Sequence, residues 1–128
     1  MKLKRIHHVA IICSDYEKTK DFYVNKLGLR VVAEVLRKER NSWKLDLAVG
    51  DQYQIEIFSF LDPPKRVSRP EASGLRHLAF EVENIEETAA ELSERGIACE
   101  PIRTDEFTGK KFTFFSDPDD LPLEIYEG

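Results

Sequence analysis

The chain has 128 residues, of which 41% are hydrophobic and 34% charged, and its net charge is −5. This length predicts one domain over 1–128, and the composition is typical of a soluble globular protein. The acidic balance argues against a nucleic-acid or membrane-surface binder, because either would need a basic field. The two cysteines are too few for a disulfide framework, and no apolar run is long enough for a membrane span or a signal sequence, so a cytoplasmic location is expected.

The first half of the chain predicts a strand, a helix and then three strands. Ile6–Cys13 is an apolar run rich in valine and isoleucine, which is typical of a buried strand. Asp15 is the expected N-cap of a helix that runs to about Leu27, and Gly28 stands where a helix ends. The three strands are expected at 29–38, 43–49 and 53–60.

The segment 61–74 is expected to be a linker, because its prolines and Gly74 fit neither a helix nor a strand. It separates module one, about 1–60, from module two, about 75–128. Four basic side chains lie in or beside this segment. They are either solvated surface charges or functional groups, which would bind an anionic substrate or contact a partner in a dimer. These residues are Lys65, Arg66, Arg69 and Arg76.

The second half repeats the order of the first. A strand is expected at 75–83, and Asn84 with Glu87 three residues later forms the pattern of a capping box. The helix that follows should end at Gly96. Three further strands are expected at 97–103, 110–116 and 122–127.

Matched positions indicate that the chain is an internal duplication. Gly28 matches Gly96, and Glu56 matches Glu124 at the same offset along the chain. His8 matches His77 at an offset that is longer by a single position. These matches occur in the same order in both halves. The sequence therefore predicts an α+β fold of two tandem β-α-β-β-β modules.

The alternation of side chains along strands gives the matched polar residues a common facing. Glu56 lies between two isoleucines and Glu124 between Leu123 and Ile125, so both glutamates point away from the helices, and both histidines have the same facing. Singly, such residues are usually structural or solvated. As a duplicated set of two imidazoles and two carboxylates they suit Zn, Ni, Co, Mn or Fe. One divalent ion per chain is therefore predicted, with the ligands His8, Glu56, His77 and Glu124.

Further residues are candidates for contact with a small-molecule substrate. The alternation of side chains gives the same facing as the four ligands to Lys44, Asp46, Phe112 and Phe114. Arg103, in the second module, is a further cation that could contact a substrate. The predicted substrate-binding residues are Lys44, Asp46, Arg103 and Phe114.

The chain resembles the vicinal oxygen chelate superfamily, which includes glyoxalase I, fosfomycin-resistance thiol transferases, methylmalonyl-CoA epimerase, extradiol dioxygenases and bleomycin-resistance proteins. The resemblance covers essentially the whole chain, through HHVAIICSD followed by FYVNKLGL, then RHLAFEVEN, and finally SDPDDLPLEIY. It implies a curved mixed sheet around a metal-binding cup, with the glyoxalase I ligands on the same four residues. It also implies a homodimer, and leaves open whether the cup closes within one chain or across the dimer.

The glyoxalase I-like pattern implies a metal-dependent lyase or isomerase. Its ion would bind two vicinal oxygens of the substrate and stabilise an enediolate, while Glu124 or Glu56 moves the proton. Ile12 and Phe60 replace an arginine and an asparagine that serve glutathione in glyoxalase I, so the glutathione clamp is expected to be lost. Two alternatives remain: an epimerase or thiol transferase on the same metal, and a non-catalytic drug-binding protein of the bleomycin-resistance type.

Overall fold

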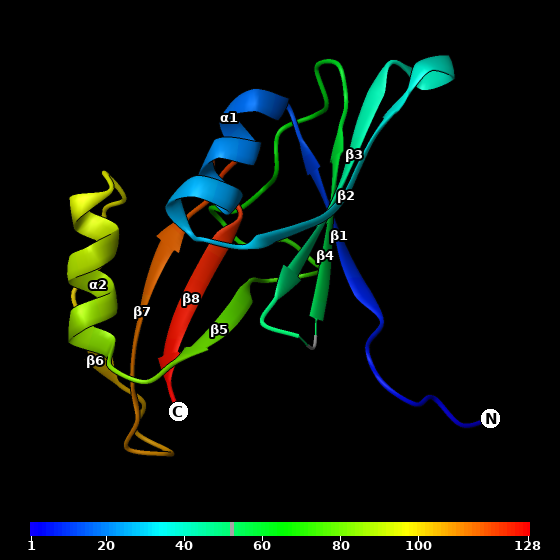
Figure 1. Cartoon of the computed structure of the whole chain (residues 1–128). Coiled ribbons are helices and arrows are strands. Elements are labelled where there is room, and N and C mark those ends of the chain that lie inside the picture. The colour runs from blue at the N-terminus through cyan, green and yellow to red at the C-terminus, as the bar shows by residue number, and fades with distance from the viewer. Residues whose placement is uncertain (52) are drawn as a thin grey trace. The chain divides into compact units, whose positions relative to one another are not determined.

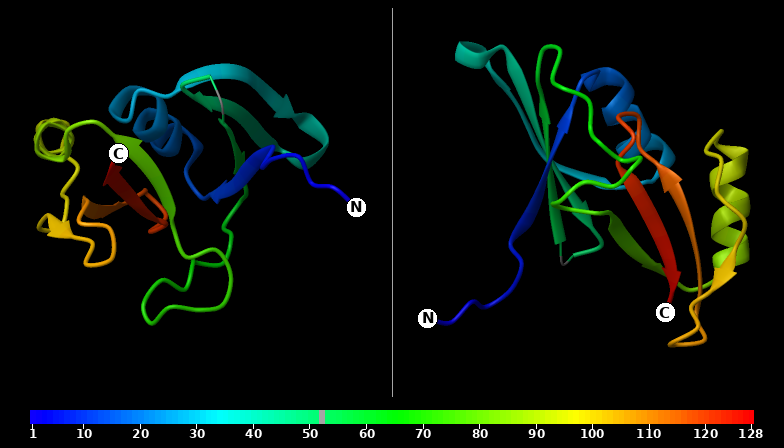
Figure 2. Two further views of the ribbon diagram at one scale, coloured as in Figure 1. Left: turned by 90° about the horizontal axis from the view of Figure 1, so that it is seen from below. Right: turned by 180° about the vertical axis from the view of Figure 1, so that it is seen from behind.

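The computed structural model describes residues 1–51 and 53–128, and the chain divides into two compact units, Met1–Pro64 and Lys65–Gly128. Each unit contains a four-stranded mixed sheet and a helical segment that follows the first strand of that sheet (Figures 1 and 2). The predicted α+β class and the two β-α-β-β-β modules are therefore confirmed. The sequence also predicts a turn at 50–52, between the strands expected at 43–49 and 53–60, and this turn falls partly outside the described residues.

The first unit builds its sheet in the order β1-β4-β3-β2. Strand β1 runs parallel to β4, and the other neighbours are antiparallel. Leu45, Leu47 and Ile57 are fully buried on one face of this sheet and form its core. The elements are β1 (His8–Cys13), α1 (Tyr16–Lys20), a π-helix (Asp21–Lys26), β2 (Arg30–Arg37), a 3₁₀ turn (Lys38–Arg40), β3 (Ser42–Val49) and β4 (Tyr53–Ser59).

The helical segment of the first unit explains the slip of a single position in the repeat. The carboxylate of Asp15 accepts the backbone N–H of Lys18 at 3.2 Å, as expected of an N-cap. Further along, the N–H of Leu27 bonds the carbonyl of Phe22, five residues back, at 2.9 Å. Such a π-turn takes up one residue more than an α-helical turn. The first module therefore holds its extra residue inside this helix, before Gly28 ends it at φ +77°.

The second unit repeats the arrangement, with sheet order β5-β8-β7-β6 and β5 parallel to β8. Asn84 accepts the N–H of Glu87 at 3.0 Å, which confirms the predicted cap. Helix α2 lies along β7 and β8 (Figure 1). No helix in the described residues is long and apolar enough to cross a membrane. The elements are β5 (Leu78–Val82), α2 (Ile85–Glu94), β6 (Arg103–Thr104), β7 (Lys111–Ser116) and β8 (Pro122–Glu127).

Two expected strands of this unit are shorter than predicted. The strand expected at 97–103 is wrong for most of its length, because the ladder with β7 consists of Arg103–Thr104. Before it, the N–H of Glu100 donates one backbone hydrogen bond to the carbonyl of Phe114 at 2.9 Å. Pro101 has no N–H to donate, so a ladder cannot continue through it. The strand expected to begin at Leu75 begins at Leu78. The carbonyls of Leu75 and Arg76 accept hydrogen bonds from the guanidinium of Arg66 instead of from a neighbouring strand.

The segment 61–74 contains neither helix nor strand in its described residues, as predicted, and its later part is anchored to the second unit. The Ser68 hydroxyl donates to the carbonyl of Asp120 at 2.7 Å. Arg69 donates two hydrogen bonds to the Asp120 carboxylate, at 2.8 and 3.0 Å. Asp120 itself adopts φ +66°, where a glycine would be the easier residue. Arg66 and Arg69 are therefore structural cations of this segment.

Candidate metal and substrate site

The strand register places one histidine and one glutamate together in each unit. Ala10 on β1 is paired with Glu56 on β4, and Ala79 on β5 is paired with Glu124 on β8. Each histidine stands two residues before the alanine of its own unit, and side chains two apart along an extended chain share a face. The Nε2–Oε1 distance is 3.7 Å for His8 and Glu56 and 3.5 Å for His77 and Glu124.

These separations suit two ligands of one ion better than a hydrogen-bonded pair. Both exceed the usual N–H···O distance of about 3.2 Å or less. With metal–ligand bonds of about 2.0–2.2 Å, two neighbouring ligands of one ion lie roughly 3.0–3.5 Å apart. Each pair therefore fits a shared divalent ion to within a few tenths of an ångström. Taken within either unit, the described residues gather no set of three or more histidine, cysteine or carboxylate ligands.

The first pair is embedded in a polar network. Glu56 accepts a hydrogen bond from Gln54 at 3.2 Å, and its cross-strand neighbour is Asp46. Lys44 donates to Asp46 at 2.7 and 2.9 Å and lies 4.0 Å from Glu56, so one ammonium group faces two carboxylates. The predicted residues Lys44 and Asp46 thus lie beside this pair. The Nδ1 atoms of His7 and His8 are 3.0 Å apart, which helps to orient the His8 ring.

The second pair has an aromatic setting. Phe114 is the cross-strand neighbour of Glu124, and its ring meets the His77 ring edge-on, with centroids 5.0 Å apart. Burial raises the pKa of the Glu124 carboxyl, while the charges of His77 and then of Arg103 act to lower it. The offset that relates Glu56 to Glu124 also relates Asp46 of the first module to Phe114. The duplicated site is therefore polar in one half and aromatic in the other.

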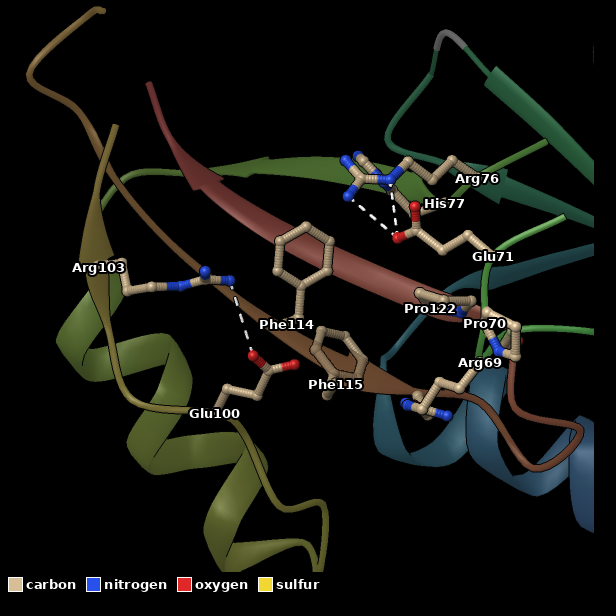
Figure 3. Close-up of a pocket in the computed structure, with 12 residues that line it drawn as sticks. Arg69, Pro70, Glu71, Arg76, His77, Glu100, Arg103, Phe114, Phe115 and Pro122 are labelled. Carbon is tan, nitrogen blue, oxygen red and sulfur yellow. Dashed lines mark hydrogen bonds and ion pairs between the residues drawn. The ribbon is translucent and has the colours of Figure 1, made fainter. Parts of the chain in front are cut away.

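A cavity of about 280 Å³, here called the His77 pocket, opens beside the second pair (Figure 3). It contains the predicted residues His77, Arg103 and Phe114. Its lining residues are Ser68, Arg69, Pro70, Glu71, Arg76, His77, Glu100, Arg103, Phe114, Phe115, Ser116 and Pro122. Glu71 and Glu100, which each face an arginine, were not expected from the sequence, since both lie in irregular segments where side-chain facing follows no period.

The fold is that of a protein built from two tandem β-α-β-β-β modules, each of which sets a histidine beside a glutamate. A model of the glyoxalase/bleomycin resistance protein/dioxygenase superfamily matches residues 5–125. The chain belongs to this superfamily.

Its similar relatives span nearly the same length. Protein YwkD of Bacillus subtilis (strain 168) is 64% identical, with 99% of each chain covered. Protein YaeR of Escherichia coli (strain K12) is 56% identical, over 98% of this chain and 97% of the relative. The crystal structure of a glyoxalase family protein from Enterococcus faecalis is 58% identical, has a TM-score of 0.91, and is matched over 99% of this chain and 100% of that one.

Proposed function

We propose that this protein is a cytoplasmic, metal-dependent lyase or isomerase of the glyoxalase I-like branch, with one divalent ion (Zn, Ni, Co, Mn or Fe) per chain. The ligands would be His8, Glu56, His77 and Glu124. The observation that carries this proposal is that each duplicated module sets a histidine and a glutamate at ligand spacing on the same sheet face. Two imidazoles and two carboxylates form a donor set that suits these ions.

The ion would supply positive charge to two vicinal oxygens of the substrate. Proton transfer is assigned to the glutamates, and the two differ in how firmly they are held. Glu56 accepts a hydrogen bond from Gln54 and has Lys44 nearby, which suits a fixed ligand. Among the described residues, the direct polar contact of Glu124 is with His77. Its carboxylate is thus the better placed to take a proton from one substrate carbon and return it to the next.

The substrate is expected to be small and to differ from a glutathione adduct. The His77 pocket, at about 280 Å³, lies just below the usual range for small-molecule sites, roughly 300–1,000 Å³. Ile12 and Phe60 are apolar and half-exposed, and offer no charged group to the glutathione carboxylates. Substrate contacts are assigned to Lys44 and Asp46 in the first module and to Arg103 and Phe114 in the second.

An epimerase or thiol transferase would use the same four ligands, and only turnover separates these reactions from a lyase. A drug-binding protein without metal is the alternative from another class, and the aromatic side of the His77 pocket favours it as the second candidate. Metal analysis followed by a turnover screen of 2-oxoaldehyde adducts with several thiols tests the proposal. A metal-free protein without turnover would favour the drug-binding alternative.

A further inference from the structure

Phe112 and Phe114, two residues apart on β7, form an aromatic surface that is here called the aromatic wall, and Phe114 is the one of the two that lines the His77 pocket. The Phe114 ring stands edge-on to His77, and the Phe112 ring stands edge-on to Phe114 with centroids 6.0 Å apart. In the first module the corresponding positions carry Lys44 and Asp46. This half of the duplicated site therefore presents flat apolar surface where the other half presents charge.

Arg103 lies over this aromatic wall. Its guanidinium carbon is 5.0 Å from the centroid of Phe112 and 5.8 Å from that of Phe114. Stacking on rings orients a guanidinium while leaving its N–H groups directed outward along the plane. Figure 3 shows Phe114 projecting into the cavity between Arg103 on one side and Arg76 on the other. The aromatic wall and an oriented cation thus meet at one corner of the pocket.

The three arginines of the pocket differ in how their donors are used. Arg76 donates to Glu71 at 3.0 Å, and Arg69 donates twice to Asp120. Arg103 approaches Glu100 only to 3.6 Å, and within the described residues its guanidinium has no hydrogen bond. Both members of this last pair are more than half exposed, and such ion pairs contribute little. The N–H groups of the Arg103 guanidinium are therefore available to donate hydrogen bonds to a bound anion.

We propose that Arg103 and Phe114 form a subsite for the carboxylate end of a small, planar, unsaturated acid. This inference rests on the proposed function, because it names the substrate class of that same site. A carboxylate matches the two parallel N–H groups of one guanidinium. A phosphate would carry a second negative charge, and the remaining arginines of the pocket already bind carboxylates of the chain. A planar carbon skeleton fits the ring of Phe114 and the small volume of the cavity.

The test is an NMR titration of the full-length chain in EDTA with benzoate as the probe. Benzamide lacks the charge, cyclohexanecarboxylate lacks the flat ring, and phenyl phosphate replaces the carboxylate. Benzoate should bind saturably and more tightly than each of these three, with shifts centred on Arg103 and Phe114. Because EDTA removes metal, the titration does not depend on metal content. The titration therefore tests the subsite, whereas metal analysis and turnover test the proposed function, and the failure of one can be distinguished from the failure of the other.

Variants sharpen the titration. Arg103→Met should weaken benzoate binding roughly tenfold or more, through loss of a charge-assisted contact. Glu100→Gln should tighten it, because the competing carboxylate at 3.6 Å is removed. Arg95→Met is the matched control: Arg95, at the end of α2, also binds a nearby glutamate but does not line the pocket, so affinity should stay unchanged. Arg103→Lys keeps the charge but loses the fork, and it gives a second reading, expected to be several-fold weaker, should the methionine variant fail to fold.

Four outcomes would overturn the subsite. They are absence of saturable benzoate binding to the wild-type chain, equal affinity of the wild type and folded Arg103 variants, equal affinity for benzamide, and tighter binding of phenyl phosphate than of benzoate. Equal affinity for cyclohexanecarboxylate would overturn the planar requirement.

Discussion

The Nε2 atom of His77 lies 3.5 Å from the Oε1 atom of Glu124, where β5 begins beside the parallel strand β8. The first module repeats the relationship with His8 and Glu56 at 3.7 Å, although its surroundings are polar rather than aromatic. A histidine kept only for packing would need no carboxylate at this spacing in both settings. The repeated spacing is therefore the feature on which the proposed metal site depends.

Replacement of the two glutamates should have unequal effects. Glu124→Gln removes the assigned proton acceptor while leaving an oxygen ligand, so kcat is expected to fall by about 10²–10⁴-fold. Glu56→Gln should cost less, because the amide still offers an oxygen beside Gln54. Steady-state kinetics on a substrate found by the turnover screen give the comparison, with the exposed Glu81→Gln on β5 as the control. A larger loss in Glu56→Gln would reverse the assignment.

The glutathione hemithioacetal of methylglyoxal should be turned over weakly or not at all. Ile12 and Phe60 supply neither a guanidinium nor an amide, and losing one charge-assisted contact costs about 1.5–3 kcal/mol. Two such losses make glutathione a poor carrier. Kinetics with methylglyoxal and glutathione check this directly. A kcat/KM above about 10⁴ M⁻¹s⁻¹ would mean that other residues bind glutathione.

Stability in acid should depend on Glu34 on β2. Hydrogen bonds from Lys20, at 2.8 Å, and from the Tyr16 hydroxyl lower the pKa of Glu34 below its ordinary value of 4.5. A lowered folded-state pKa stabilises the fold above the unfolded-state value, and this stabilisation is lost as pH falls. Glu34→Gln should therefore lower Tm relative to wild type at pH 7, and the gap should close below about pH 4.5. Glu39→Gln, in the exposed 3₁₀ turn, is the control. A gap that stays constant with pH would exclude this linkage.

A homodimer is expected at micromolar concentration. Strand β2 forms an edge of its sheet, and Val31, Val32 and Val35 are exposed along it. Exposed apolar edges favour association, and symmetric dimers are the commonest oligomers. Light scattering should give about twice the chain mass of 14.8 kDa, and Val35→Lys should lower it. Phe107→Lys, at an exposed turn, serves as the control. A wild-type mass equal to that of a single chain would contradict the dimer.

The features that could be predicted from the sequence depend on local chemistry. Asp15 and Asn84 cap helices through hydrogen bonds to backbone N–H groups only three residues further along the chain, so the local sequence suffices to identify both caps. The alternation around Glu56 and Glu124 likewise fixes which face each glutamate takes. The alternation of side chains along the strands therefore suffices to predict that each histidine lies on the same sheet face as the glutamate of its own module.

The features that could not be predicted depend on contacts distant in sequence. The strand expected at 97–103 is a separate case, because Pro101 itself lacks the N–H that a ladder needs, and this is a local signal against a strand. The carboxylates that bind Arg69 and Arg76 lie in irregular segments, where side-chain direction follows no helix or strand period. The sequence therefore does not indicate that these two arginines form ion pairs within the chain. Arg103 differs from both, because within the described residues its guanidinium approaches Glu100 only to 3.6 Å and has no hydrogen bond.

Metal content measures the central claim most directly. After equilibration with Zn²⁺ or Ni²⁺ and removal of excess, elemental analysis should find about one ion per wild-type chain. His77→Ala should lose most of it, because one of four ligands is gone and Glu124 loses its partner. Glu39→Ala removes a carboxylate from the exposed 3₁₀ turn, which holds none of the proposed ligands, and should keep about one ion per chain. Full retention of the ion by His77→Ala would contradict the site.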